Sequence, residues 1–306
     1  MTLTELRYIV ALNQTQHFGK AAEKCFVSQP TLSVAIKKLE EELDVALFER
    51  SRSQVRPTAI GKQIIEQAQT VLDQANQIQE LADLGKDPLG STLSIGAIFT
   101  VGPYLFPHFV PRLQKSTPNM PLYVEENYTA VLREKLRHGE LDAIVIALPF
   151  NEPDVVTQTL YEETFVVLLP ADHSLAKSSN ITPKQLESEQ VLLLGEGHCF
   201  RDQVLDACPN LKKVLSNAHD QLQSVVEGSS LETLKHMVAS GLGITILPES
   251  AAQLSQYGNG LLCTRPLISS ASTRSVALAW RASFPRHQAI DALSLAIKQS
   301  AVAQSA

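Results

Sequence analysis

Residues 21–40 read AAEKCFVSQPTLSVAIKKLE, and this stretch decides the fold of the amino-terminal region. Apolar residues recur at helical spacing over 18–26. The pattern is interrupted at 27–29 and resumes at the same spacing after Pro30. Proline is favoured in the first turn of a helix because its missing N–H has no helical partner there. With a further helix predicted over 3–14, the pattern predicts a helix-turn-helix over 18–43.

The second helix of this pair begins with small hydrogen-bonding side chains, which suit contacts to base edges and phosphates in a DNA major groove. Residues 47–58 hold three arginines and are expected to form a β hairpin, or wing, that faces a phosphate backbone. The periodicity alone is equally typical of an ordinary three-helix bundle, and these two features favour DNA binding. The candidate DNA contacts are Ser28, Gln29, Pro30, Thr31, Ser33, Lys37, Arg50 and Arg52.

The chain has 306 residues, 44% of them hydrophobic, so two or three domains with sizeable cores are expected. Its net charge of -6 argues against polyanion binding as the main property of the whole chain. Residues 1–60 hold eight Lys or Arg against seven Asp or Glu, a net charge of only +1. No apolar run approaches the roughly 20 residues of a membrane helix, and the first residues lack a signal-peptide pattern. We therefore expect a cytoplasmic protein without membrane contact.

Residues 58–84 contain no proline and carry an apolar stripe, which predicts one long helix packed on a partner, with a hinge at 85–90. Beyond the hinge, short β-like runs alternate with helical patterns, which predicts an α/β fold of mostly parallel sheets with helices on both faces. The length of this region suggests two subdomains with a cleft between them. The expected boundaries are 1–58 for a winged helix-turn-helix, 59–89 for a linker helix and hinge, and 90–306 for a regulatory domain, with subdomain I at about 90–162 and 267–306 and subdomain II at about 163–266.

Two of the four cysteines, Cys199 and Cys208, flank a segment that has the pattern of a helix. In an intact helix their Cα atoms would lie roughly 13 Å apart, whereas a disulfide needs about 7 Å or less. A bond between them therefore requires the segment to refold. Cys199 stands at the predicted helix start beside His198 and Arg201, and the helix dipole and both side chains favour its thiolate.

The pair is therefore a candidate redox switch, in which Cys199 attacks the O–O bond of a peroxide and becomes a sulfenic acid. Cys208 can then condense with it, because Pro209 weakens the last helical turn. The alternative is that both are buried structural cysteines, as free cysteines mostly are. Cys25 and Cys263 lie in apolar stretches and are expected in the core.

Other chemistries find little support in the sequence. No Cys and His spacing matches a zinc site, so no bound metal is expected. Gly241 and Gly243 lead into a predicted strand instead of opening a helix, which is typical of a turn and not of a nucleotide loop. A serine hydrolase is not supported because no G-x-S-x-G elbow occurs. The sequence implies no cofactor.

Residues 1–85 resemble the winged helix-turn-helix of LysR-type transcriptional regulators. The resemblance is carried by the stretch quoted above and by LFER at 47–50. The remainder is similar to the periplasmic-binding-protein-like effector domain of that family, which has two α/β subdomains. Within the family, GHCFRDQ at 197–203 followed by Cys208, and TVGPYL at 100–105, resemble the hydrogen peroxide sensors. From about 209 to 226 the sequence departs from the better-known sensors and is longer.

The resemblance implies a regulator and not an enzyme, with Cys199 as peroxidatic and Cys208 as resolving cysteine of a reversible disulfide. It implies that Thr100, Thr129, His198 and Arg274 position the peroxide. It further implies dimers through the 58–84 helix, tetramers, binding to double-stranded promoter DNA, contact with RNA polymerase, control of antioxidant genes, and reduction by glutaredoxin or glutathione. Two alternatives stay open: a LysR-type regulator whose cleft binds a small metabolite, and a thiol peroxidase, against which the helix-turn-helix argues.

Overall fold

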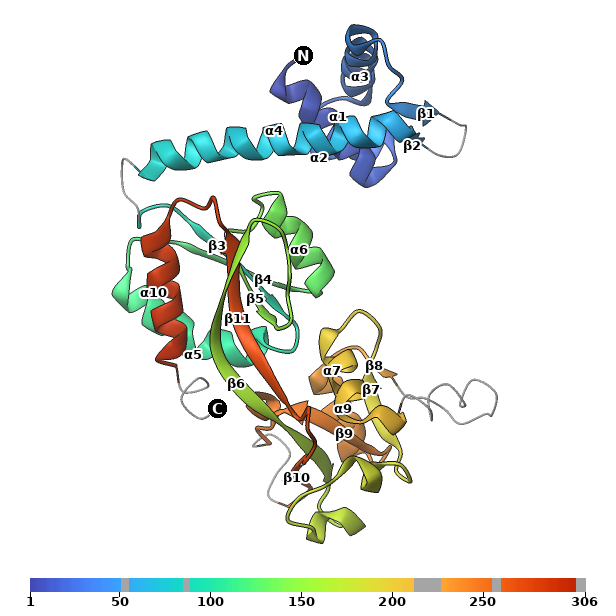
Figure 1. The fold of residues 1–306 in the computed structure, drawn as a ribbon, viewed down its shortest axis with the longest axis vertical. Helices are drawn as coiled ribbons and strands as arrows, with labels where there is room; N and C mark the ends of the chain where they lie inside the picture. The colour runs from blue at the N-terminus through green and yellow to red at the C-terminus, as the bar shows by residue number, and fades with distance from the viewer. Residues whose placement is uncertain (51–54, 85–88, 212–226, 255–259, 301–306) are drawn as a thin grey trace. The chain divides into compact units, whose positions relative to one another are not determined.

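The computed structural model describes residues 1–50, 55–84, 89–211, 227–254 and 260–300. The chain divides into two compact units, Met1–Lys86 and Asp87–Ala306 (Figure 1). Arg52, part of the predicted hinge and most of the divergent segment after Pro209 lie outside the described residues. Within the described part of the chain, no helix is both long and apolar enough to cross a membrane.

The amino-terminal unit consists of three short helices, a two-stranded hairpin and a long helix. Its elements are α1 (Leu3–Thr15), α2 (Phe18–Lys24), α3 (Gln29–Leu43), β1 (Phe48–Arg50), β2 (Val55–Pro57) and α4 (Ala59–Leu84). The two strands pair antiparallel, with Glu49 opposite Arg56. The predicted helix-turn-helix, wing and long helix are confirmed, although α2 ends two residues before Phe26.

The helix α3 begins where the sequence supplies a capping residue. Ser28 is its N-cap, and Ser28 Oγ accepts a hydrogen bond from the Thr31 N–H at 3.3 Å. Leu32, Ile36 and Leu39 are buried at helical spacing in a core shared with α1, α2 and α4. Because burial takes one side of α3, its opposite side is left for solvent or a partner.

The carboxy-terminal unit is an α/β structure, as predicted. Its strands are β3 (Leu93–Ile98), β4 (Leu122–Asn127), β5 (Ala143–Ala147), β6 (Val155–Pro170), β7 (Val191–Leu194), β8 (Glu227–Gly228), β9 (Ile244–Pro248), β10 (Leu262–Pro266) and β11 (Thr273–Arg281). Its helices are α5 (Gly102–Ser116), α6 (Thr129–Arg137), α7 (Cys199–Ala207), α9 (Leu231–Ala239) and α10 (His287–Lys298), with short 3-10 turns at Ser174–Lys177, Pro183–Leu186 and Glu249–Ala251.

The strands form one sheet in the order β4-β3-β5-β11-β6-β9-β7-β8, with β10 paired to β6. β3 pairs parallel with β4 and β5, and β7 pairs parallel with β8 and β9. In contrast, β6 and β11 run antiparallel to every strand with which they pair. The predicted parallel pairing therefore holds on either side of these two long strands, among β3, β4 and β5 and among β7, β8 and β9, and it fails where β6 and β11 pair.

The strand β6 contributes to two hydrophobic cores in succession. Leu160 and Tyr161 belong to the first core, which β3, β5, β11, α5 and α10 complete. Residues 165–169 belong to the second core, with β7, β9, α7 and α9. Figure 1 shows β6 and β11 running together from one part of this unit to the other. Two cores on one continuous strand pair give the unit two parts, and α7 packs at the second of them.

Candidate functional site

Cys199 is the first residue of α7 and directly follows a tight turn. Gly197 holds that turn at φ +91°, and a Cβ at this position would lie 3.2 Å from the Tyr128 ring. The backbone angle and the close ring both favour glycine here. His198 is the N-cap residue of α7 and Cys208 its C-cap, so the predicted helix between the two cysteines is confirmed.

A small cavity of about 10 Å³ lies at the start of α7. Its walls are formed by Ile98, Phe99, Thr100, Asn127, Tyr128, Thr129, Gly197, His198 and Cys199. Thr100 comes from the loop between β3 and α5, and Thr129 is the first residue of α6. The fold thus places Cys199 and its chain neighbour His198 in one cavity with Thr100 and Thr129, which are far from them along the chain.

Two of these wall residues carry polar atoms without partners. Within the described residues, neither Thr129 Oγ1 nor His198 Nε2 has a hydrogen-bond partner, although both atoms are buried. A buried polar atom normally bonds to protein or to ordered water, so an unpaired one requires an explanation. Together these atoms offer a hydroxyl and an imidazole nitrogen to a small polar molecule.

His198 is 6% exposed, and burial lowers the pKa of its imidazole, while a hydrogen bond with the Ser229 backbone opposes this shift. The neutral imidazole is therefore favoured near pH 7. Its ring centroid lies 4.8 Å from that of Tyr128 and 5.8 Å from that of Phe99. These two aromatic wall residues were not predicted, because a single aromatic residue near a strand end carries no distinctive sequence signal.

Arg274 lies behind Thr100 and does not line the cavity. Its Nη1 donates to Thr100 Oγ1 and its Nη2 to the Thr100 carbonyl, both at 2.9 Å. Its Nε donates to Glu163 Oε1 at 2.8 Å, and its guanidinium lies 5.0 Å from the centroid of the Phe200 ring. Arg274 and Glu163 are only 3% and 2% exposed. A buried, charge-assisted bond network therefore holds Thr100 in place.

Arg201 also lies outside the cavity wall. Its Nη1 donates to the carbonyl of Leu194, the last residue of β7, at 2.6 Å. This bond ties α7 to the strand that precedes it. Cys199 itself is the first residue of α7.

The two thiols belong to different cores. Cys199 is partly buried against the first core, whereas Cys208 is 1% exposed within the second. Burial raises the pKa of the Cys208 thiol to about 11. At neutral pH, Cys208 is therefore a protonated thiol shielded from solvent, with the whole of α7 between it and Cys199. All four cysteines are free thiols, and Cys25 and Cys263 are partly buried against cores.

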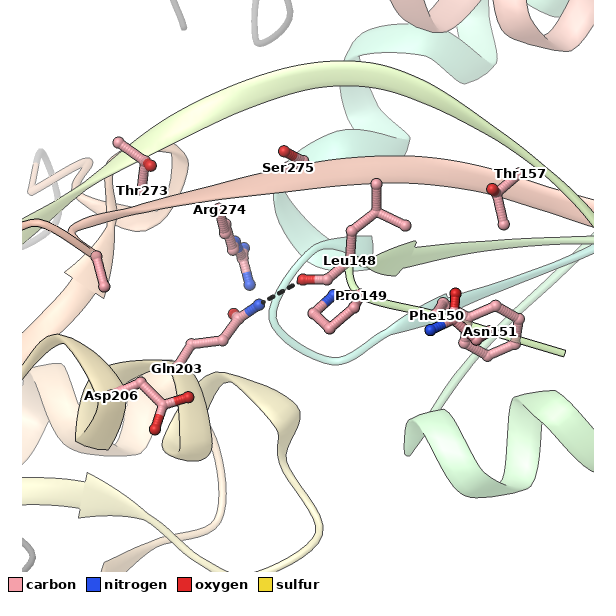
Figure 2. Close-up of a pocket in the computed structure, with 11 residues that line it drawn as sticks. Leu148, Pro149, Phe150, Asn151, Thr157, Gln203, Asp206, Thr273, Arg274 and Ser275 are labelled. Atoms are coloured by element: carbon pink, nitrogen blue, oxygen red, sulfur yellow. Dashed lines mark hydrogen bonds between the residues drawn. The ribbon is translucent and has the colours of Figure 1, made fainter.

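A second, open hollow of about 570 Å³ is bordered by β11, residues 148–151, and Gln203 and Asp206 of α7. Figure 2 shows Gln203 reaching from α7 to the Leu148 carbonyl, which accepts a hydrogen bond from Gln203 Nε2 at 3.3 Å. Gln203 Oε1 is buried and has no hydrogen-bond partner in the described part of the chain. With hydroxyl groups from Thr157 and Thr273 also in the wall, the hollow suits a small polar molecule.

The residues predicted to contact DNA gather around the start of α3 and along its open side. Gln29, Pro30, Thr31 and Lys37 are exposed, Ser33 is half-buried, and Ser28 caps the helix. Lys37 Nζ lies 3.5 Å from Glu41 Oε1. Arg50 is the last residue of β1, and Arg52 lies outside the described residues.

Two apolar residues on this surface are exposed, which the helical patterns of the sequence did not reveal. Phe26 is 96% exposed with φ +56°, and Val34 of α3 is 68% exposed. The apolar spacing over 18–26 predicts a helix that reaches Phe26, but α2 ends at Lys24, so the predicted end of the helix is wrong. Apolar periodicity does not reveal a helix end when the residues beyond the end are apolar as well.

Comparison with known families matches the two units separately. Residues 3–62 match the bacterial regulatory helix-turn-helix protein of the lysR family, and residues 86–301 match the LysR substrate binding domain. The chain belongs to the LysR family. It is accordingly a DNA-binding transcription regulator, and the resemblance noted in the sequence is confirmed.

This LysR-family regulator is similar along nearly its whole length to proteins called OxyR. The DNA-binding transcriptional dual regulator OxyR of Escherichia coli K12 is 35% identical over 298 residues, 97% of this chain and 95% of that protein. A full-length OxyR variant of Pseudomonas aeruginosa with a cysteine-to-aspartate change is 56% identical, with a TM-score of 0.77, over 99% of this chain and 97% of that one. A hydrogen-peroxide-bound cysteine-to-serine variant of Corynebacterium glutamicum OxyR is 32% identical, with a TM-score of 0.62, over 97% and 92% of the two chains.

Proposed function

We propose that this LysR-family regulator senses hydrogen peroxide and is switched by a reversible disulfide between Cys199 and Cys208. The observation that carries the proposal is the small cavity in which Cys199 meets two buried polar atoms, Thr129 Oγ1 and His198 Nε2, that lack partners among the described residues. Hydrogen peroxide is a very small polar molecule that can both donate and accept hydrogen bonds, as these two atoms require. The peroxide-bound OxyR variant among the similar structures supports the same ligand.

In the first step, the Cys199 thiolate attacks one oxygen of the peroxide. The O–O bond breaks, Cys199 becomes a sulfenic acid, and the second oxygen leaves as hydroxide, which takes up a proton and becomes water. Thr129 and His198 hydrogen-bond the peroxide, and neutral His198 can accept a proton at Nε2. Thr100 borders the peroxide on another side, and Arg274 acts by holding Thr100.

In the second step, the Cys208 thiol condenses with the Cys199 sulfenic acid, which forms the S–S bond and releases water. An intact α7 separates the two Cα atoms by roughly 13 Å, and Cys208 is only 1% exposed. The helix must therefore unwind, and Cys208 must leave the second core. Such a refolding provides the two-state element through which a local redox change can reach the DNA-binding unit.

The rest of the proposal follows the family resemblance. The regulator would act in the cytoplasm on promoters of antioxidant genes, in contact with RNA polymerase, and glutaredoxin or glutathione would restore its thiols. Dimers through α4 agree with the exposed apolar residues Val71 and Ile78 on that helix. A dimer or tetramer doubles each weak DNA contact, and the refolded regulatory unit would change the spacing of the DNA-binding units.

A second candidate function is a response to a small metabolite in the larger hollow of Figure 2, where Gln203 Oε1 has no partner among the described residues. In that case, the regulatory response would survive replacement of Cys199 by serine. Membership of a family of transcription regulators favours both of these functions over a thiol peroxidase.

The test is peptide mapping by mass spectrometry of the full-length reduced protein after one equivalent of hydrogen peroxide. We expect a peptide pair joined through Cys199 and Cys208, which Cys199→Ser and Cys208→Ser both abolish. Cys263→Ser is the matched control, because this thiol is also partly buried but lies outside the cavity, and it should leave the bond intact. Thiols that stay unmodified at one equivalent would contradict the proposal and favour the metabolite-responsive regulator.

A further inference from the structure

Phe26 is an aromatic residue in an unfavourable place. Its side chain is 96% exposed, and its φ of +56° lies in the left-handed region that disfavours any residue with a Cβ, especially a bulky one. Two features that each weaken a fold thus coincide at one position of the amino-terminal unit. Such an outlier points to a role outside the packing of the domain.

The turn explains the backbone of Phe26 but not its side chain. The Phe26 N–H donates to the Glu23 carbonyl and the Val27 N–H to the Ala22 carbonyl, both at 3.0 Å. The left-handed residue lets its neighbours Cys25 and Val27 both pack against the amino-terminal core. Glycine would meet this backbone requirement without strain, so the aromatic ring must be explained by something that it contacts.

The surroundings of Phe26 indicate what that contact is. The next elements along the chain are Ser28, the N-cap of α3, and the exposed first-turn residues Gln29, Pro30 and Thr31. In a helix-turn-helix, the start of the second helix meets base edges in the major groove. Apolar side chains, phenylalanine included, contact the C5-methyl group of thymine there. A ring without charge gains little from phosphates, so a base is the better partner.

We propose that Phe26 is a specificity-determining DNA contact, whose ring packs on a thymine methyl group in the major groove. The inference concerns which DNA the regulator selects. It does not depend on the chemistry of Cys199, and the peroxide experiment described above neither supports nor weakens it.

The test compares Phe26→Gly with Gln16→Gly in the full-length protein. Gln16 is also exposed and left-handed, with φ +49°, and is uncharged, so its replacement relieves the same backbone strain. Both variants should melt at or above the temperature of the unchanged protein. The probe is a duplex that the unchanged protein selects from a random-sequence pool. On it, Phe26→Gly should bind roughly tenfold more weakly and Gln16→Gly normally.

Two further readouts identify the contact. The slope of log affinity against log salt should be unchanged in Phe26→Gly, because no phosphate contact is lost. Replacing thymines of the duplex one at a time by uracil should reveal a position where the unchanged protein loses affinity and Phe26→Gly does not. Equal uracil effects in both proteins, or undiminished binding by Phe26→Gly, would overturn the proposal. A change in oligomeric state of Phe26→Gly without DNA would also overturn it, because the ring would then join two copies of the chain.

Discussion

Exposure of Cys208 through local opening of α7 can be tested by shortening a side chain that anchors this helix. Val204 is 2% exposed in the second core, beside Cys208. Its replacement by alanine removes two buried methyl groups and leaves a small cavity, which destabilises the packed helix by about 2 kcal/mol. If α7 opens as a unit, the open state should become about 30-fold more populated, at roughly 1.4 kcal/mol per factor of ten.

The assay is the rate at which a maleimide modifies Cys208 at pH 7.5, in a Cys199→Ser background so that only one of the two thiols reacts. Closed α7 blocks this reaction twice, because the thiol is buried and because a pKa of about 11 leaves very little thiolate. Val204→Ala should therefore accelerate labelling by about 30-fold.

The matched control is Val145→Ala, which removes the same two methyl groups from the fully buried strand β5 of the first core. It should lower global stability but change the rate of Cys208 labelling by less than about twofold, because α7 opens while the first core stays folded. Equal acceleration by both variants would show that Cys208 is exposed only by global unfolding. That result would refute the idea that α7 is a separate switching element.

Three further outcomes are expected. Burial raises the Cys208 pKa from 9.0 to about 11, so this thiol ionises at a lower pH in the unfolded chain than in the folded one. It should therefore leave the free energy of unfolding unchanged below pH 9 and lower it by about 1.4 kcal/mol per pH unit from 9 to 11. In urea titrations, Cys208→Ala should remove this fall. Arg274→Met leaves the Glu163 carboxylate buried and unpaired and should lower stability in urea by about 3–5 kcal/mol, with part recovered by adding Glu163→Gln. Gly197→Ala should slow peroxide oxidation of Cys199. In thermal melts it should destabilise the fold more than Gly241→Ala does. Both sites have positive φ, but only at Gly197 would the added Cβ lie 3.2 Å from an aromatic ring.

Local features of the chain predicted most of its helices. The start of α3 follows from a serine cap and a proline, and α7 follows from the glycines before it and the proline after it. Both signals act within a few residues and need no tertiary information. The polar first half of β6, by contrast, was not recognised as a strand, because its residues 155–164 are stabilised by pairing with β11, more than 100 positions away.

For the candidate site as well, some features follow from the local sequence and others only from the tertiary structure. The sequence by itself determined that two thiols stand at opposite ends of one helix, because helical rise and capping are local properties. Only the tertiary structure decided that Thr100 and Thr129 meet Cys199 in one cavity, that Arg274 supports Thr100 from behind, and that Cys208 is buried in a different core. These relations depend on the pairing of strands that are distant in the chain, and such pairing is set by packing of the whole unit.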